Sequence, residues 1–185
     1  MDSVVVRILV GLVALAGCGA ELTDDGQKQN LSPDSGLTID APPIDAAPCT
    51  GGAAAMRDPG GTCYILVTGP KVRAEAEAGC VAMGAHLAKI RNAQENATVA
   101  ALVATTASAF LGGNDLVTEG TFLWPDGSAL TYTNWRTGEP NNGGPMATYQ
   151  EDCIVIQGLL AGVWDDRPCA PPPVGAGSYA YVCSY

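Results

Sequence analysis

The sequence predicts an α+β domain with an antiparallel sheet over residues 49–185. The order of the expected elements supports this prediction, because a strand comes first, two helices follow, and short strands joined by long loops fill the rest. Six of the chain's seven cysteines lie in this part, which indicates a disulfide-stabilised fold. With 185 residues in all, the chain has room for one ordinary domain and its appendages.

The domain is expected to open with a hairpin and a helix. Asp58-Pro59-Gly60-Gly61 is a strong turn signal, and the β-prone run 62–67 follows it directly. The next segment, 71–83, is rich in alanine and glutamate and stops at Gly84. A glycine at that place predicts the C-cap of a first helix.

A second helix and several strands complete the expected elements. Asn92 and Glu95 predict the N-cap and a partial capping box of a helix that ends near Ala104, and no helix is expected beyond it. The segment 110–185 is instead rich in Gly, Pro, Asn and aromatic residues. Its expected strands are Phe110-Leu111, Phe122-Leu123-Trp124, Cys153-Ile154-Val155-Ile156 and Tyr179 to Cys183.

Residues 1–18 indicate export and lipid attachment. Arg7 precedes the apolar run 8–16, which is long enough for the hydrophobic part of a signal peptide and too short to span a bilayer. Leu15-Ala16-Gly17-Cys18 follows and resembles the bacterial lipobox, so we expect the odd cysteine, Cys18, to be lipidated. The alternative is a plain signal peptide with a chance cysteine at its end. A lipid on Cys18 would be the expected membrane attachment, in the outer membrane or at the cell surface.

Residues 19–48 are expected to form a disordered acidic linker. They contain aspartates among Pro, Ser, Gly and Gln and no aromatic residue, so they cannot bury enough apolar surface to fold. A flexible chain of this length would hold the domain roughly 30 Å from the bilayer.

Composition excludes several functions. Nine basic against nineteen acidic residues give a net charge of −10, which argues against a nucleic-acid partner. The single histidine, His86, cannot build a multi-histidine metal site and disfavours Ser-His-Asp or Cys-His catalysis. We therefore expect no enzyme and no catalytic residue.

The loops of the C-terminal half are strongly acidic. Only one basic residue, Arg136, lies among eight acidic ones between positions 115 and 166. Such a set is costly to pack unless a cation neutralises it, and calcium prefers this kind of oxygen ligand. The alternative is that these are solvated loop charges. The acidic residues are Asp115, Glu119, Asp126, Glu139, Glu151, Asp152, Asp165 and Asp166.

Several motifs, in this order and spacing, resemble the C-type lectin domain family. The resemblance covers Cys49 to the end of the chain. Its later motifs are Glu139-Pro140-Asn141, Glu151-Asp152-Cys153, Trp164-Asp165-Asp166 with Cys169, and Tyr181-Val182-Cys183. Its earlier motifs are the segments 74–80 and 84–90, Glu95-Asn96 and Phe110-Leu111-Gly112-Gly113.

The resemblance implies a disulfide pattern that the sequence alone leaves open among fifteen pairings. In the long form of the family, Cys80 pairs with Cys183, Cys153 with Cys169 and Cys49 with Cys63. It also implies that His86 occupies a turn in the core after the first helix.

The resemblance further implies a calcium site whose ion shares its ligands with a sugar. The implied calcium ligands are Glu139, Asn141, Glu151, Asp165 and Asp166, and the first four would also contact sugar hydroxyls. A lower-ranked accessory calcium site would use Asp115, Glu119, Asp152 and Glu151, with Asn142 where the family usually has Asp. The Glu-Pro-Asn order implies the mannose, glucose, N-acetylglucosamine and fucose class.

Asp165 departs from the family pattern, which usually has Asn there. An ionised carboxylate can still bind calcium but cannot donate a hydrogen bond to a hydroxyl. The expected function is a surface-tethered, calcium-dependent carbohydrate-binding module with a glycan or glycoprotein ligand. The alternatives are a domain that binds a protein, with calcium in a structural role only, and, least favoured, a glycosidase that uses Glu139 and Glu151.

Overall fold

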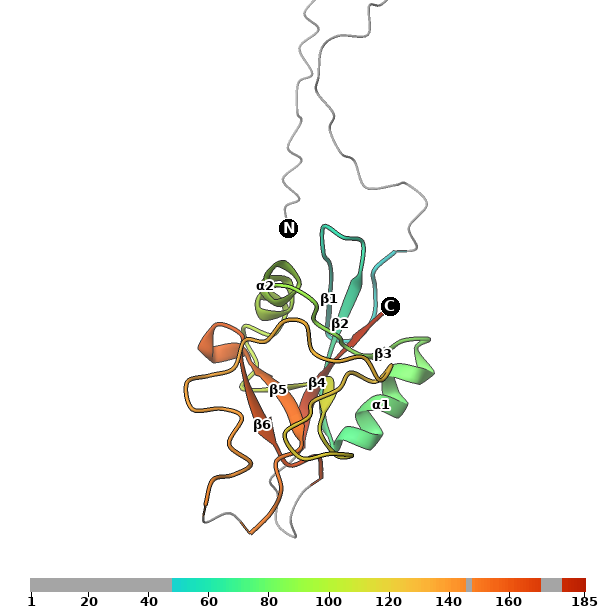
Figure 1. Ribbon diagram of the computed structural model, residues 1–185. Helices are drawn as coiled ribbons and strands as arrows, with labels where there is room; N and C mark the ends of the chain where they lie inside the picture. Colours follow the sequence, from blue (N-terminus) through green and yellow to red (C-terminus); the bar gives the residue numbers. More distant parts are fainter. Residues whose placement is uncertain (1–47, 146–147, 171–177) are drawn as a thin grey trace, which may run out of the picture. The chain divides into compact units, whose positions relative to one another are not determined.

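The computed structural model describes residues 48–145, 148–170 and 178–185. The predicted signal segment, Cys18 and nearly all of the predicted linker lie outside these residues. Within them, seven strands form one sheet in the order β1-β2-β7-β4-β5-β6, and β3 pairs with β7 (Figure 1). The strands are β1 Ala54–Arg57, β2 Cys63–Lys71, β3 His86–Leu87, β4 Ala109–Asn114, β5 Cys153–Gln157, β6 Val163–Arg167 and β7 Tyr179–Ser184. The helices are α1 Arg73–Ala82, α2 Ala93–Leu102 and the short 3-10 helix η1 Gly158–Leu160.

The sheet is mainly antiparallel, as expected, but it contains one parallel pair of strands. The last strand, β7, enters the middle of the sheet between β2 and β4, antiparallel to β2 and parallel to β4. All other paired strands run antiparallel. The predicted hairpin is confirmed as β1 and β2, and its turn is closed by the Thr62 backbone N–H, which donates to Asp58 Oδ1 at 2.7 Å.

Both predicted helices are confirmed, with ends that shift by one to two residues. At the end of α1, Gly84 adopts φ 73° and its N–H donates to the carbonyl of Val81, while the N–H of Ala85 donates to that of Cys80. This is a Schellman cap, which accounts for the glycine. At the start of α2, the Asn92 side chain accepts from the N–H of Glu95 at 2.9 Å, as the capping signal predicts.

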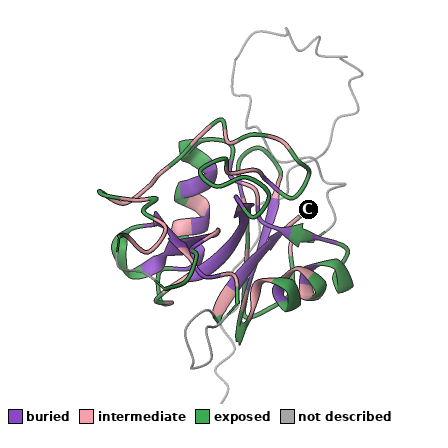
Figure 2. Cartoon of the chain, turned by 60° about the horizontal axis from the view of Figure 1, so that its bottom comes forward, coloured by how far each residue is buried: buried purple, intermediate pink, exposed green. Residues whose placement is uncertain are grey.

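The strands bury both faces of the sheet. Along β2, Tyr64 and Leu66 face one apolar cluster with α2 and the tryptophans, and Cys63 and Ile65 face a second cluster with α1. β5 alternates in the same way, as the two-residue period of a strand requires. Figure 1 shows the sheet between α1 and α2, and Figure 2 shows that its strands are largely buried.

The three disulfides are those that the family resemblance implies. Cys49 pairs with Cys63, Cys80 with Cys183 and Cys153 with Cys169, and their Cα atoms lie 5.4, 5.4 and 5.2 Å apart. The 80–183 bridge ties α1 to β7. The other two fix the ends of β2 and β5.

His86 is not a core residue, contrary to the expectation. Its side chain is 70% exposed on the short strand β3, and Nδ1 lies 2.7 Å from Oε1 of Glu77. The two-residue strand alternates, so Leu87 points into the core and His86 points out. The histidine nevertheless has a partner in Glu77. The same carboxylate also accepts from the backbone N–H of Leu87 at 2.9 Å.

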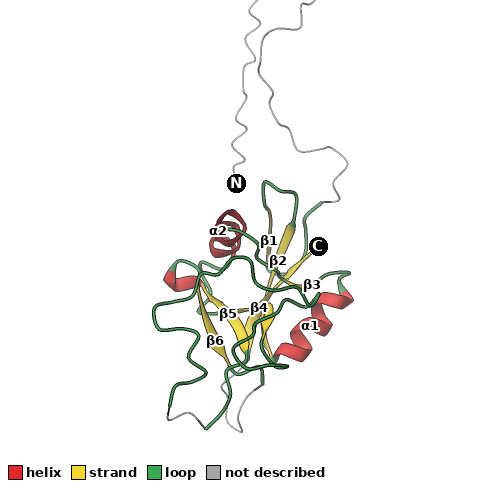
Figure 3. Cartoon of the chain, in the orientation of Figure 1, coloured by secondary structure: helices red, strands yellow, loops and turns green. Residues whose placement is uncertain are grey.

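Loops fill the chain between β4 and β5 (Figure 3). The run 122–124, expected as a strand, forms only isolated bridges through Leu123. Among the described residues, no helix is long and apolar enough to cross a membrane.

Candidate metal and ligand site

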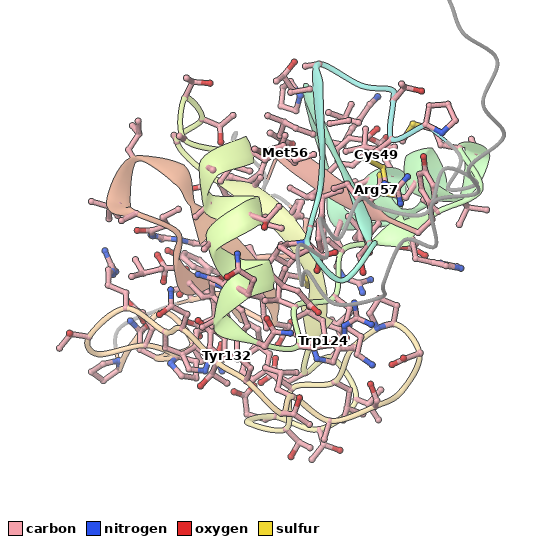
Figure 4. The ribbon with its side chains drawn as sticks, turned by 90° about the horizontal axis from the view of Figure 1, so that it is seen from above. Cys49, Met56, Arg57, Trp124 and Tyr132 are labelled. Atoms are coloured by element: carbon pink, nitrogen blue, oxygen red, sulfur yellow. A yellow bond between two sulfur atoms is a disulfide. The ribbon has the colours of Figure 1, made fainter. Side chains whose placement is uncertain are left out.

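The site is built where the loop region meets β6. The Trp164 N–H donates to the carbonyl of Asn134 at 2.7 Å, and the Arg136 N–H donates to the carbonyl of Trp164 at 2.8 Å. The buried Trp164 ring packs edge-on against Trp124, Tyr132 and Trp135. Figure 4 shows Trp124 and Tyr132 on the loop side of the molecule, apart from Met56 and Arg57 of β1. Trp124 and Trp164 are therefore core residues beneath the loop region.

Trp164 also fixes β6 against α2. Its indole N–H donates to Oδ1 of Asn96 at 2.8 Å, and Asn96 Nδ2 donates to the carbonyl of Gly162 at 3.2 Å. Asn134 Nδ2 donates to the same carbonyl at 2.9 Å. The residues that follow Trp164 are thus held by contacts from a helix and from the loop.

Asp166 anchors the Glu-Pro-Asn loop to β6. Its carboxylate accepts from the backbone N–H of Asn141 at 3.0 and 3.1 Å and from that of Asn142 at 2.6 Å. Asn142 adopts φ 50°, a left-handed conformation that turns two consecutive N–H groups toward one anion. The adjacent Glu139-Pro140 peptide is cis.

Three of the five predicted calcium ligands converge. One carboxylate oxygen from each of Glu139, Asp165 and Asp166 lies within 4.8 Å of the others. Asn141 joins the same group, because its amide donates to Oε2 of Glu139. A donor set made only of oxygen atoms, with several carboxylates, fits calcium and not a soft metal such as zinc.

Two arginines reach into this cluster. Arg136 Nη2 lies 2.5 Å from Oε1 of Glu139 and 3.6 Å from Oδ2 of Asp165. Arg167 Nη2 lies 2.6 Å from the same Asp165 oxygen. Arg167 was not among the predicted site residues, since it lies one residue beyond the acidic segment. Part of the negative charge that a cation was expected to neutralise is therefore neutralised by the chain's own arginines.

Glu151 is buried but lies outside the close cluster. Its Oε1 lies 3.6 Å from Nη1 of Arg167, and its backbone N–H donates to Oδ1 of Asn142 at 2.7 Å. Burial raises the pKa of Glu151, the Arg167 guanidinium lowers it, and the negative charges of Asp166 and Asp165 raise it. The net effect is a raised pKa, so the folded protein destabilises the ionised form of Glu151.

Two residues of the predicted accessory site, Asp115 and Glu119, line a neighbouring cavity. The cavity measures about 270 Å³, and its lining includes Asp115, Glu119 and Asp166. Asp115 Oδ2 accepts from the Gly120 N–H at 2.8 Å, whereas Oδ1 is buried and has no hydrogen-bond partner among the described residues. An orphaned buried carboxylate oxygen beside two more carboxylates fits a calcium ligand.

The carboxylates in and beside this cavity repel one another. Burial raises the pKa of Asp115, and the negative charges of Glu119 and Asp152 raise it further against the hydrogen bond from Gly120. Burial and the charge of Asp166 raise the pKa of Asp152. Asn142 contributes no charge here, because its side chain is a neutral amide. That amide donates to Gln150 Oε1 and accepts from the backbone N–H of Glu151.

Comparison with known proteins gives concordant matches. The chain matches the family described as the Lectin C-type domain over residues 70–184. It is 37% identical over 136 residues to the alpha-N-acetylgalactosamine-specific lectin of Patiria pectinifera, covering 66% of this chain and 73% of that protein.

Two solved structures are also similar. The cow C-type carbohydrate-recognition domain of CD23, in the presence of GlcNAc2Man3 oligosaccharide, gives a TM-score of 0.56 at 27% identity and covers 74% of this chain and 95% of that one. The Ca2+-dependent type II antifreeze protein, in its Ca2+-free form, gives 0.56 at 28% identity and covers 68% and 92%.

Proposed function

The chain belongs to the C-type lectin domain family, and we propose that it is a calcium-dependent carbohydrate-binding module. The observation that carries this proposal is the convergence of Glu139, Asp165 and Asp166 within 4.8 Å beside the Asn141 amide. The family is generally non-enzymatic and some of its members are sugar-specific lectins, as the Patiria pectinifera relative is by name. The carboxylates therefore serve better as ligands than as a catalytic pair.

The residues would share two tasks. Glu139, Asn141, Asp165 and Asp166, with Glu151 behind them, would hold Ca2+, which when bound supplies two open coordination positions for vicinal sugar hydroxyls. The carboxylates of Glu139 and Glu151 would accept hydroxyl protons, and the Asn141 amide would donate to a hydroxyl oxygen. Asp115, Glu119 and Asp152 would hold an accessory Ca2+ beside the orphaned Asp115 oxygen.

We propose sugars of the mannose, glucose, N-acetylglucosamine and fucose class as ligands. The Glu139-Pro140-Asn141 order supports this class through the family resemblance. The related lectin named for N-acetylgalactosamine makes that sugar the competing candidate. Sugars of the mannose class and N-acetylgalactosamine should therefore be tested side by side.

The test measures calcium binding and sugar binding together. In calcium the melting temperature should rise, and the domain should be retained on a mannose resin and released by chelator. Glu139→Gln should abolish retention. Asp126→Asn is the matched control, since it removes the same charge from an exposed carboxylate that pairs with Lys89 away from the site. Melting curves that coincide with and without calcium would refute the proposal.

A second candidate is a protein-binding domain in which calcium only shapes the loops. It is favoured by Asp165, whose carboxylate cannot donate to a hydroxyl and is engaged by Arg167 and Gln157. Calcium-dependent melting without retention on any sugar resin, N-acetylgalactosamine included, would support it.

We further propose that the chain is exported and lipid-anchored through Cys18, with residues 19–48 as a tether. The lipobox-like sequence after the apolar run supports this anchor. Cys18→Ser should abolish fatty-acid labelling and leave an unprocessed precursor. A mature wild-type chain that enters the aqueous phase of a detergent separation would contradict the anchor.

A further inference from the structure

Asp165 stands where the family usually has an amide, and its surroundings differ from those of a free carboxylate. Its side chain is 2% exposed. Arg167 Nη2 and Gln157 Nε2 both lie 2.6 Å from Oδ2 of Asp165, and Arg136 Nη2 lies 3.6 Å from the same oxygen. All three contacts fall on one oxygen, so Oδ1 is the oxygen that these groups leave free.

The strand explains why Arg167 meets Asp165. Residues two apart on β6 point to the same face of the sheet, which places the two side chains next to each other. Gln157, at the end of the neighbouring strand β5, completes the arrangement through its side-chain amide. The second guanidinium nitrogen of Arg167 lies 3.6 Å from Glu151, so one arginine faces two of the predicted ligands.

With one divalent cation bound, the charges of this site would balance. Glu139, Glu151, Asp165 and Asp166 carry four negative charges, and Arg136 and Arg167 carry two positive ones. The remaining charge of −2 equals the charge that one divalent cation neutralises. A fourth carboxylate without Arg167 would leave an uncompensated negative charge facing a neutral sugar.

We propose that Arg167 is a positioning residue that converts Asp165 into a charge-neutral, single-oxygen ligand, so that the Asp165–Arg167 pair replaces the amide of the family. This inference rests on the proposed function and specifies how the site tolerates an aspartate. Arg167 would thereby set the calcium affinity through Asp165 and not by general attraction or repulsion alone.

The test is a double-mutant cycle with Asp165→Asn and Arg167→Gln, measured in calcium and in chelator. In chelator, Arg167→Gln should lower the melting temperature in the wild type, where it leaves a buried carboxylate underpaired, and much less beside Asp165→Asn. In calcium, Arg167→Gln should change the calcium Kd by between about 2-fold and 100-fold in the wild type, with little change beside Asp165→Asn. The direction expected is tighter calcium binding, because the Asp165 carboxylate, freed from its ion pair with Arg167, would act on the cation with its full negative charge.

Two further variants separate the pair from general electrostatics. Arg136→Gln removes the same charge from the same site, but its closest partner is Glu139, so its effect on the calcium Kd should persist beside Asp165→Asn. Arg167→Lys should have a calcium Kd between those of the wild type and Arg167→Gln, because lysine keeps the positive charge but lacks the second hydrogen-bonding nitrogen of the guanidinium.

The outcomes are distinguishable. Equal effects of Arg167→Gln in the presence and absence of Asp165, in a chain that binds calcium, would overturn this inference and leave the proposed function standing. A wild type that binds no calcium would overturn the proposed function and with it the metal role of Arg167. In that case the coupling in chelator would still report whether the ion pair forms.

Discussion

Asp166 shows how a single carboxylate can serve both the loop and the site. It is 1% exposed and accepts backbone hydrogen bonds from Asn141 and Asn142, which fixes the loop against β6. Hydrogen bonds to a charged group contribute about 1.5 to 3 kcal/mol each, more than neutral ones. The loop is therefore pre-organised around this carboxylate by the chain's own amides.

Three other carboxylates give a prediction for pH. The pKa values of Asp115, Glu151 and Asp152 are raised, each chiefly by burial. The folded state therefore binds protons more readily than the unfolded state, and its stability falls as the pH rises through the raised pKa values. In excess chelator, the melting temperature at pH 5 should exceed that at pH 7.5 by a few degrees.

Calcium should reverse this order, because the ion requires the same carboxylates in their ionised form. Asp126 does not disturb the comparison. Hydrogen bonds from Ser128 and Lys89 hold its pKa below the usual 3.8, so its stabilisation is lost only at more acidic pH than the window used. A melting temperature in chelator that falls on acidification from pH 7.5 to 5 would contradict this assignment.

The candidate site combines carboxylates that the motifs name with an arginine, Arg167, that they do not name. Glu139, Asp165 and Asp166 converge as the motifs imply, because the family pattern places them around one loop. Arg167 could not be assigned from spacing, since its role follows from sharing a strand face with Asp165. The position of Glu151 outside the close cluster likewise depends on side-chain contacts that no motif encodes.

β6 is a strand that sequence patterns do not reveal. Its residues include Asp165, Asp166 and Arg167, which lack the apolar alternation of a half-buried strand. The strand forms because β5 pairs with all five of its residues and the loop carbonyl of Asn134 accepts from Trp164. The caps at Gly84 and Asn92 were predictable because their signals are local.

Strand β4 gives a prediction about how closely the loop packs. A Cβ atom on Gly112 would lie 2.6 Å from Cγ of Pro125 and 2.7 Å from the carbonyl oxygen of Leu87, a backbone atom that cannot yield easily. Gly112→Ala should therefore lower the free energy of unfolding by about 1 to 3 kcal/mol. Chemical denaturation in calcium measures the change.

Gly69→Ala is the matched control, because the same atom on this exposed β2 residue would meet nothing within 4 Å. It should leave the free energy of unfolding nearly unchanged. Equal stability of the two variants would show that the loop does not press on β4 as the structure indicates.

In the described domain, two apolar clusters lie on opposite faces of one sheet. α2, the tryptophans and the loop region cover one face, and α1 with the disulfides covers the other. The site is attached to the first cluster through Trp164 and to the second through Cys153, which directly follows Asp152. Disruption of either cluster would therefore displace the predicted calcium ligands.

The disulfides should differ in how much they stabilise the domain, because they close loops of very different length. The Cys80–Cys183 bridge spans 103 residues and joins α1 to the central strand β7, whereas Cys49–Cys63 spans 14 residues beside the first hairpin. In the chain-entropy account, the long bridge stabilises by about 4.7 kcal/mol and the short one by about 3. Cys80→Ala with Cys183→Ala should therefore lower the free energy of unfolding more than Cys49→Ala with Cys63→Ala. Urea unfolding in saturating calcium compares the two. A hairpin variant that loses as much stability as the long-bridge variant would contradict the dependence on loop length.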